Sequence, residues 1–271
     1  AMVSAASAND VKGGHSFFDV HFGSDVTFEN TYINSGSFLF SRFGDNQGSG
    51  ENRFVVKSTV DIPINDVEIS TDIEFDYLNG SFNRNYSTPD ELKYGNFQLK
   101  QDDLTLILGV SVFYSKDTEA SRSNIYLYPH VTASYRLVND VLIAYGGVEG
   151  GLIQNSYYGF ATENPFVSPT LNIMPTDQLY NGYVGLKGKV TSNMSYNISG
   201  RFNSDRNKAL FINNEITATT QNYSYGNSFG IVYDDVKTVS FAGEINVDVN
   251  KRSVLSQWPI NCDYTVYSDT W

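Results

Sequence analysis

The stretch DVEISTDIEFDY at residues 66–77 alternates strictly between two kinds of side chain. Because successive side chains of a β-strand point to opposite faces, it predicts a strand with one apolar wall and one acidic wall. Strands of globular proteins usually have about 5–6 residues, whereas a tilted membrane-crossing strand needs roughly 9–11. The length therefore favours a membrane strand. The apolar-leaning set is Val67, Ile69, Thr71, Ile73, Phe75 and Tyr77, and the intervening set is Asp66, Glu68, Ser70, Asp72, Glu74 and Asp76.

The same alternation recurs in three other stretches. Residues 238–249 predict a second long strand, and rows of apolar residues at 104–114 and 125–137 predict two more, the last interrupted by Pro129. In a membrane barrel we expect Val239, Phe241, Ile245, Val247 and Val249 to point away from the barrel axis, and Glu244, Asn246 and Asp248 to point toward it.

Short polar turns alternate with longer polar stretches along the chain. This alternation is typical of outer-membrane barrels, which have short turns at one end and long loops at the other. Two strands between successive short turns give roughly twelve strands. We expect short turns near Gly23-Ser24, Asn65-Asp66, Gln101-Asp102, Asn139-Asp140, Ser192-Asn193 and Asp235, and long loops at residues 45–51, 79–91, 116–123, 150–176 and 203–225.

The sequence thus predicts an all-β protein: an antiparallel transmembrane β-barrel, or about half of a larger one. The barrel domain would occupy residues 15–271 after an irregular segment at 1–14, with no plug domain. No apolar run approaches the roughly 18 residues of a membrane-crossing helix. On this arrangement the acidic rows face a wet interior, because burying them unpaired would be very costly. The acidic residues expected in the lumen are Glu68, Asp72, Glu74, Asp76, Glu244 and Asp248.

Composition narrows the classes of function. The 271 residues include 18 Lys and Arg against 30 Asp and Glu, a net charge of -12, which disfavours a nucleic-acid partner because phosphates need a basic surface. Cys262 is the only cysteine, so an internal disulfide and a cysteine metal cluster are excluded. The composition leaves open what Cys262 does.

No constellation of residues predicts catalysis, and no cofactor or metal is expected. Residues 226–230 spell the G-x-S-x-G pattern of a hydrolase elbow around Ser228, but that chemistry needs a strand-turn-helix context, and here a strand follows. His15, His21 and His130 lack the spacing of a zinc motif. Aromatic residues in the expected loop 150–176 suit stacking on a ligand or simple packing over the barrel mouth, and we weigh the two equally. They are Tyr157, Tyr158, Phe160 and Phe166.

An ordered set of motifs resembles the barrel of TonB-dependent receptors. The motifs are YPHVTASYRLVND (128–140), AYGGVEGG (144–151), NPFVSPT (164–170), YNGYVGLKGKV (180–190) and SNMSYNISGRF (192–202), and together they cover roughly a third of the chain. Gly182 and Thr170 stand where the family commonly has Glu. The overall character of the sequence is most similar to that of receptors of the Bacteroidetes type. The family barrel has twenty-two strands, so the chain is expected to be a fragment or a smaller relative without the plug.

The resemblance implies an outer-membrane receptor that takes up a metal chelate, glycan or other nutrient. Its expected partners are outer-membrane lipid, the small-molecule or glycan ligand, and an energising periplasmic protein that acts through a plug. Two other classes stay open: a soluble or surface β-rich binding module or adhesin without transport, and, with less support, a barrel enzyme. A requirement for detergent separates the barrel from the soluble module.

Overall fold

The described part of the chain is almost entirely β-strand. The computed structural model describes residues 16–29, 32–46, 48–64, 67–81, 85–90, 95–101, 104–117, 122–168, 171–214, 228–250, 253–255 and 260–267, so the segment 1–14 lies outside it. The strands are β1 (Phe17–Thr27), β2 (Ile33–Asp45), β3 (Gly50–Ile64), β4 (Val67–Ser81), β5 (Asn85–Asp90), β6 (Gly95–Gln101), β7 (Leu104–Asp117), β8 (Arg122–Val138), β9 (Leu142–Ile153), β10 (Thr176–Thr191), β11 (Met194–Asn213), β12 (Phe229–Asn250), β13 (Ser253–Leu255) and β14 (Ile260–Tyr267). One helix, α1 (Tyr157–Glu163), interrupts them.

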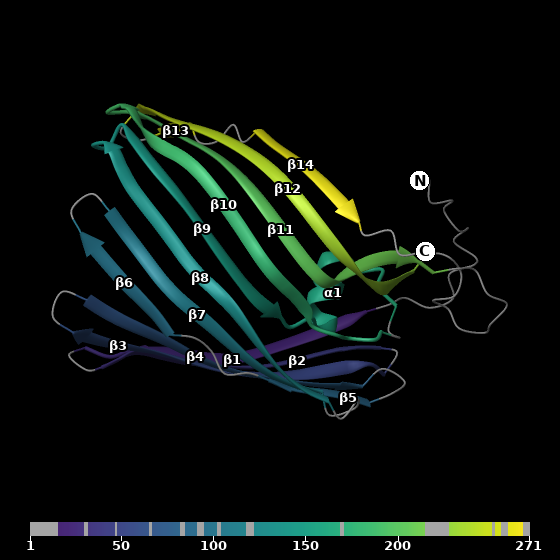
Figure 1. The fold of residues 1–271 in the computed structure, drawn as a ribbon. Helices are drawn as coiled ribbons and strands as arrows, with labels where there is room; N and C mark the ends of the chain where they lie inside the picture. The colour runs from purple at the N-terminus through teal and green to yellow at the C-terminus, as the bar shows by residue number, and fades with distance from the viewer. Residues whose placement is uncertain are drawn as a thin grey trace.

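All strands belong to one antiparallel sheet in which each, apart from β5, β6, β13 and β14, pairs with its neighbours along the chain. The path across the sheet has twelve positions, because β5 and β6 both lie between β4 and β7, and β13 and β14 both pair with β12. The sheet curves into a trough, with the early strands forming one wall and β8–β12 the other (Figure 1). In the residues that the structure describes, β1 pairs only with β2. The predicted all-β antiparallel fold is confirmed; ten of the described strands are long, and β5, β6, β13 and β14 are short.

The connections sort to the two ends of the sheet as predicted. β8 and β9, and β10 and β11, are joined by short turns at one end, whereas the long connection between β9 and β10, which contains α1, lies at the other. Ile64 of β3 pairs with Val67 of β4 at the short-turn end, and the expected turn residues Asn65 and Asp66 lie outside the described residues. Asn139 in the turn after β8 has a φ of 35°, a left-handed conformation that asparagine tolerates better than most residues. Antiparallel pairing makes this sorting obligatory once the strands are correctly counted.

Several predicted turns and loops are strand instead. Gly23-Ser24 lies inside β1 and Asp235 inside β12, while much of the expected loops 79–91 and 203–225 belongs to β4, β5 and β11. Glycine occurs at position 23 because the neighbouring strand approaches closely: a Cβ there would lie 2.6 Å from the carbonyl oxygen of Phe38. In a chain of long strands, polar residues can therefore indicate a strand wall that contacts water, and not only a turn.

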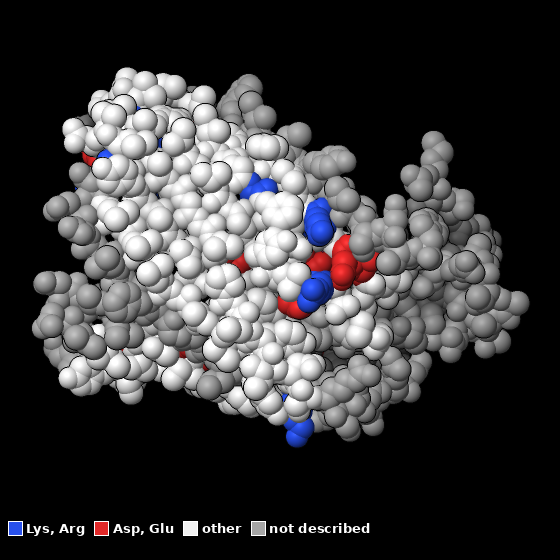
Figure 2. Space-filling view, viewed as in Figure 1, with Lys and Arg blue, Asp and Glu red and all other residues white. Residues whose placement is uncertain are grey.

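The two faces of the sheet differ in chemistry. Phe241, Gly200 and Val184 pair directly across β12, β11 and β10, and the side chains of Phe241 and Val184 are 62% and 68% exposed. The face seen over β8–β12 is largely free of charged side chains, which gather near one end of the strands (Figure 2). Other exposed apolar side chains on this convex face include Phe22, Phe40, Phe75, Val110, Leu127 and Ile198.

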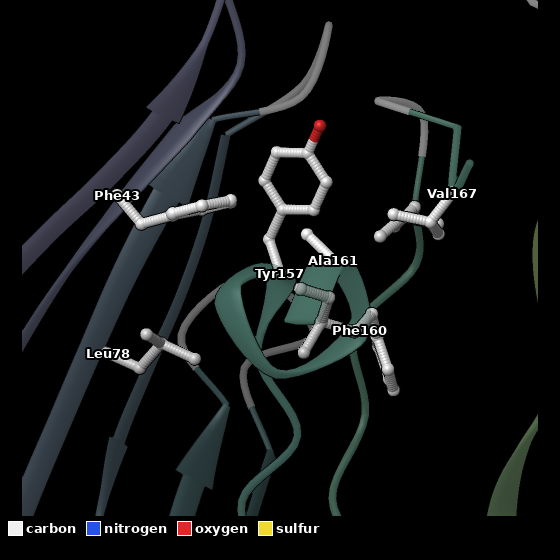
Figure 3. Close-up of a cluster of buried hydrophobic side chains, with 8 residues drawn as sticks. Phe43, Leu78, Tyr157, Phe160, Ala161 and Val167 are labelled. Atoms are coloured by element: carbon white, nitrogen blue, oxygen red, sulfur yellow. The ribbon is translucent and has the colours of Figure 1, made fainter. Parts of the chain in front are cut away.

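A hydrophobic cluster lies on the opposite, concave face, where α1 meets both walls of the trough (Figure 3). Tyr157, Phe160 and Ala161 of α1 pack there against strand residues such as Phe43 and Leu78. The cluster also includes Val167, Leu171 and Ile173 of the β9–β10 connection, with Phe211 of β11 packed against it. Among the described residues, no helix combines the length and the hydropathy that crossing a membrane requires.

Candidate functional site

The connection between β9 and β10 folds into the loop end of the trough and is fixed there by two acidic residues. The carboxylate of Glu51 accepts hydrogen bonds from the backbone amides of Tyr157 and Tyr158, at 2.8 and 2.9 Å. The hydroxyl of Tyr157 donates to Asp45 at 2.6 Å. Ser156 caps the helix by accepting from the amide of Gly159. A seven-residue helix is too short to be stable alone, so these contacts with β2 and β3 hold it.

The rest of the connection is also bonded to the sheet. Val167 forms an isolated parallel bridge with Phe229, and the amide of Ser168 donates to the carbonyl of Phe229 at 2.7 Å. The hydroxyl of Tyr233 accepts from the amide of Met174 and donates to the carbonyl of Asn172. We call residues 154–168 and 171–175 the strap. The strap spans the trough from β2 and β3 on one wall to β12 on the other.

Burial and the carboxylates raise the pKa of the Tyr157 hydroxyl. Loss of water around the phenol is the largest cause, followed by the hydrogen bond to Asp45 and the charges of Asp45 and Glu51. All of these disfavour the phenolate, because its negative charge would lie beside two carboxylates in a poorly hydrated place. Tyr157 therefore stays protonated and remains a hydrogen-bond donor, which is the form that fastens the strap.

The four aromatic residues expected to contact ligand are divided between two environments. Tyr157 and Phe160 are 0% and 5% exposed and belong to the cluster under the strap. Tyr158 and Phe166 are 37% and 63% exposed. The Tyr158 ring makes edge contacts with His21, at 5.6 Å between centroids, and with Phe43, at 5.5 Å. Tyr158 and Phe166 therefore offer ring surface to a solute, whereas the rings of Tyr157 and Phe160 are covered by protein.

The acidic row of β4 lies on the concave face and is neutralised by β3. Asp76 and Arg53 form a two-pronged salt bridge, with 2.8 Å between Arg53 Nε and Asp76 Oδ1. Glu74 pairs with Lys57 at 3.1 Å, and Asp72 accepts from the hydroxyl of Thr59. On β12, Glu244 accepts from Asn246 at 3.0 Å. The side chains of Glu68 and Asp248 lie outside the described residues.

Arg53 and Lys57 are partners that sequence reasoning missed. They occupy one face of β3, two positions on either side of Val55; Lys57 is directly opposite Glu74, and Arg53 stands diagonally across from Asp76. The signal was present as a second alternation, of cations in β3 against anions in β4. Without the register between the two strands it could not be used.

Ser228 and the histidines are placed away from one another. Ser228 is buried at the start of β12 and accepts a hydrogen bond from Asn214 at 2.9 Å. His21 pairs with Asp19 at 2.5 Å on β1, while His130 lies 4.0 Å from Glu149 on the opposite wall. Within the described ranges, no group of three or more histidine, cysteine or acidic side chains converges as a metal site. His15 lies outside those ranges.

Comparison with known proteins shows the architecture. No protein-family model and no curated protein sequence matches the chain. Among solved structures, the siderophore receptor PirA from Pseudomonas aeruginosa matches with a TM-score of 0.59 at 10% identity, over 93% of this chain and 50% of that one. The FrpB iron transporter from Neisseria meningitidis matches with a TM-score of 0.54 at 8% identity, over 92% and 43%. The alcaligin outer-membrane receptor FauA from Bordetella pertussis gives 0.54 at 11%, over 94% and 47%.

The chain thus spans about half the length of the solved structures it matches. At this level of identity the match concerns the fold: the chain has the architecture of about half of a TonB-dependent receptor barrel. This confirms the predicted fold class, including the option of a partial barrel. It also agrees with the open trough in Figure 1, whose first strand pairs on one side only among the described residues.

Proposed function

We propose that the chain is part of the barrel of an outer-membrane transporter of the TonB-dependent-receptor kind, which takes up a nutrient such as a metal chelate or a glycan. The observation that carries this proposal is the two-faced sheet. Its convex face presents apolar side chains such as Phe241 and Val184 in paired rows, and its concave face carries salt bridges such as Arg53–Asp76. A bilayer stabilises the first face, and a water-filled interior stabilises the second.

The comparisons support the transport part of the proposal. The matched structures are described as a siderophore receptor, an iron transporter, an outer-membrane receptor and a copper transporter, and none of these descriptions is of an enzyme. The overall character of the sequence supports the Bacteroidetes type within this family. An energising periplasmic partner, acting through a plug outside this sequence, belongs to the same proposal.

Location is tested in cells that express the whole gene. We expect the protein in the outer-membrane fraction, resistant to extraction by alkaline carbonate and released by detergent. A protein that is released by carbonate and stays folded without detergent would leave the apolar rows facing water. That result would contradict the membrane proposal and favour the soluble or surface binding module.

Ligand uptake is tested at the two exposed strap aromatics. We expect Tyr158→Ala and Phe166→Ala to reduce uptake of one labelled class, an iron chelate or an oligosaccharide, with normal assembly in the membrane. Phe22→Ala is the matched control, because Phe22 is an exposed aromatic on the convex face. Normal uptake in both strap variants would show that these rings serve only in packing.

A further inference from the structure

Two tyrosines on the concave face lie across two glycines of the neighbouring strand. In the β9–β10 register Tyr145 is opposite Gly185, and Tyr183 is opposite Gly147. A Cβ at Gly185 would lie 2.5 Å from the Tyr145 ring, and one at Gly147 would lie 2.7 Å from the Tyr183 hydroxyl. Each ring therefore occupies the place that a side chain of the facing residue would fill. The two ring centroids are 6.3 Å apart and the ring planes are inclined by 49°, so the rings are neighbours on the wall.

A cation lies over each ring. Lys187 Nζ lies 5.2 Å from the centroid of Tyr145, and the guanidinium carbon of Arg201 lies 5.9 Å from that of Tyr183. Both distances are within the range of cation–π contacts. The hydroxyl of Tyr145 is held by Asn197 Oδ1 at 2.6 Å, which fixes its ring. We call Tyr145, Tyr183, Lys187 and Arg201 the platform.

Three other cations on this face are neutralised by carboxylates. Arg53, Lys57 and Lys208 each form a salt bridge with a carboxylate, at Asp76, Glu74 and Asp205. Lys187 and Arg201 are exposed to the interior and contact rings and neutral groups in the described structure. Arg136 and Lys189 on the same face also form no salt bridge among the described residues, so the platform is distinguished by its rings together with its cations.

The surroundings of the platform leave room for a solute. A hollow beside it is lined by two cations, Lys187 and Lys189, two acids, Asp140 and Glu244, and neutral residues that include Asn197. Glu244 and Glu149 are the acids closest in register to the platform, opposite Asn197 and Asn181 respectively. They set a limit on how much negative charge the site accepts. Glu244 shares the hollow with Lys187, so a solute with a single carboxylate suits the site better than one with several.

We infer that the platform is a binding site for a solute that carries one carboxylate on a flat ring. The solute's ring would pack against the edges of the tyrosine rings, and the carboxylate would pair with Arg201 or Lys187, of which arginine also offers a two-pronged geometry. The inference rests on the proposed function only in taking the concave face as the interior of a pore. The site is separate from the strap and its exposed aromatics.

The test uses the whole chain in detergent micelles and three small probes. Naphthalene-2-carboxylate has both the charge and the flat ring; naphthalene-2-carboxamide lacks the charge, and cyclohexanecarboxylate lacks the flat ring. Binding is measured by calorimetry and by saturation-transfer NMR at low and high salt. We expect the carboxylate of naphthalene to bind more tightly than either partner compound, and more weakly at high salt because the ion pair is exposed.

Variants assign the binding to the platform. Arg201→Gln and Lys187→Gln should each weaken binding by about two- to fivefold, the size of an exposed ion pair, and the double variant should weaken it more. Arg42→Gln is the matched control: Arg42 lies 5.9 Å from the ring of Phe18, but in β1–β2, away from the platform. Circular dichroism and heat-modifiable mobility show whether each variant has folded.

Each outcome decides the inference. Equal binding of the charged and the neutral naphthalene probe, or equal binding by wild type and the double variant, would show that the tyrosine–glycine pairs serve only to pack the strands. A folded chain that binds as expected but does not fractionate with the outer membrane would overturn the proposed function and leave the platform standing. A membrane-embedded chain without binding would do the reverse.

Discussion

Glu51 in β3 accepts a hydrogen bond from the backbone amide of Tyr157, 106 residues further along the chain, at 2.8 Å. The other carboxylate oxygen of Glu51 accepts from the next amide, that of Tyr158, at 2.9 Å. The first turn of a helix has amides without partners inside the helix, and a buried amide without a partner is costly. One carboxylate therefore satisfies two amides and ties the strap to the wall of the trough.

Replacing Glu51 with glutamine should loosen α1. The glutamine oxygen can accept, but its amide group would face a second donor, so one helix amide loses its partner. We expect the free energy for local opening of α1 to fall by about 1.5–3 kcal/mol, the worth of hydrogen bonds to a charged group. Hydrogen exchange of the amides at residues 157–163 measures this. Glu74→Gln, which breaks the pair with Lys57 outside the strap, should leave that exchange unchanged.

Tyr157→Phe should make the protein less sensitive to alkali. Because the pKa of Tyr157 is raised in the folded protein, the unfolded chain loses this proton from about pH 10 upward while the folded protein keeps it. The stability that Tyr157 contributes is thus complete below about pH 10 and declines above it. Denaturation midpoints from pH 9 to 12 should fall less steeply in Tyr157→Phe than in wild type or in Tyr158→Phe. Parallel curves for all three would contradict the assignment.

The long strands were predictable because each has two chemically different walls. In β4 the alternation of Ile73 and Phe75 with Asp72, Glu74 and Asp76 is visible without any tertiary information, since one wall suits lipid and the other water. The end at which each connection lies followed from counting strands. The failures at Gly23 and Asp235 have the same origin, because residues typical of turns also suit a polar wall or a close strand approach.

The position of the strap could be predicted from the sequence, but its internal arrangement could not. Tyr157, Tyr158, Phe160 and Phe166 look alike as aromatic residues of one loop, yet burial separates Tyr157 and Phe160 from the other two. That division depends on Glu51 and Asp45, which are more than a hundred residues distant. Pro129 is a similar case: β8 runs through it, pairing with Val110 of β7, and pairing with β9 begins only at His130. Proline, which lacks an N–H, thus lies just before the part of β8 that pairs with β9.

The lipid-facing row predicts that arginine is far more costly at one position of β12 than at its neighbour. Phe241 is 62% exposed on the convex face, and Ser240 faces the interior beside Arg201. Phe241→Arg should destabilise the protein in lipid bilayers by about 2–4 kcal/mol, the cost of a cation near the bilayer midplane. Ser240→Arg should cost far less, because its charge reaches water. Unfolding by urea in vesicles measures both, and an equal cost would show that the convex face does not contact lipid.

The tyrosine–glycine pairs give the last prediction, which compares two glycine-to-alanine changes in adjacent parts of one sheet. At Gly185 a Cβ would lie 2.5 Å from the Tyr145 ring and 2.8 Å from the carbonyl oxygen of Ile198, whereas at Gly243 nothing lies within 4 Å. A side chain tip can move, but the backbone of β11 cannot without disturbing its pairing. Gly185→Ala should therefore cost about 1–3 kcal/mol, as overpacking does. Gly243→Ala should be neutral or stabilising by up to about 1 kcal/mol, because it reduces the freedom of the unfolded chain.

A second change separates the two sources of strain at Gly185. Replacing Tyr145 with leucine removes the ring and its hydroxyl but leaves the contact with the Ile198 carbonyl, so the double variant should recover only part of the loss. Urea unfolding in micelles of the wild type, the two single variants and the double variant gives this coupling as a double-mutant cycle. Full recovery would mean that the glycine is there for the ring alone. No recovery would mean that the spacing of the strands alone requires the glycine.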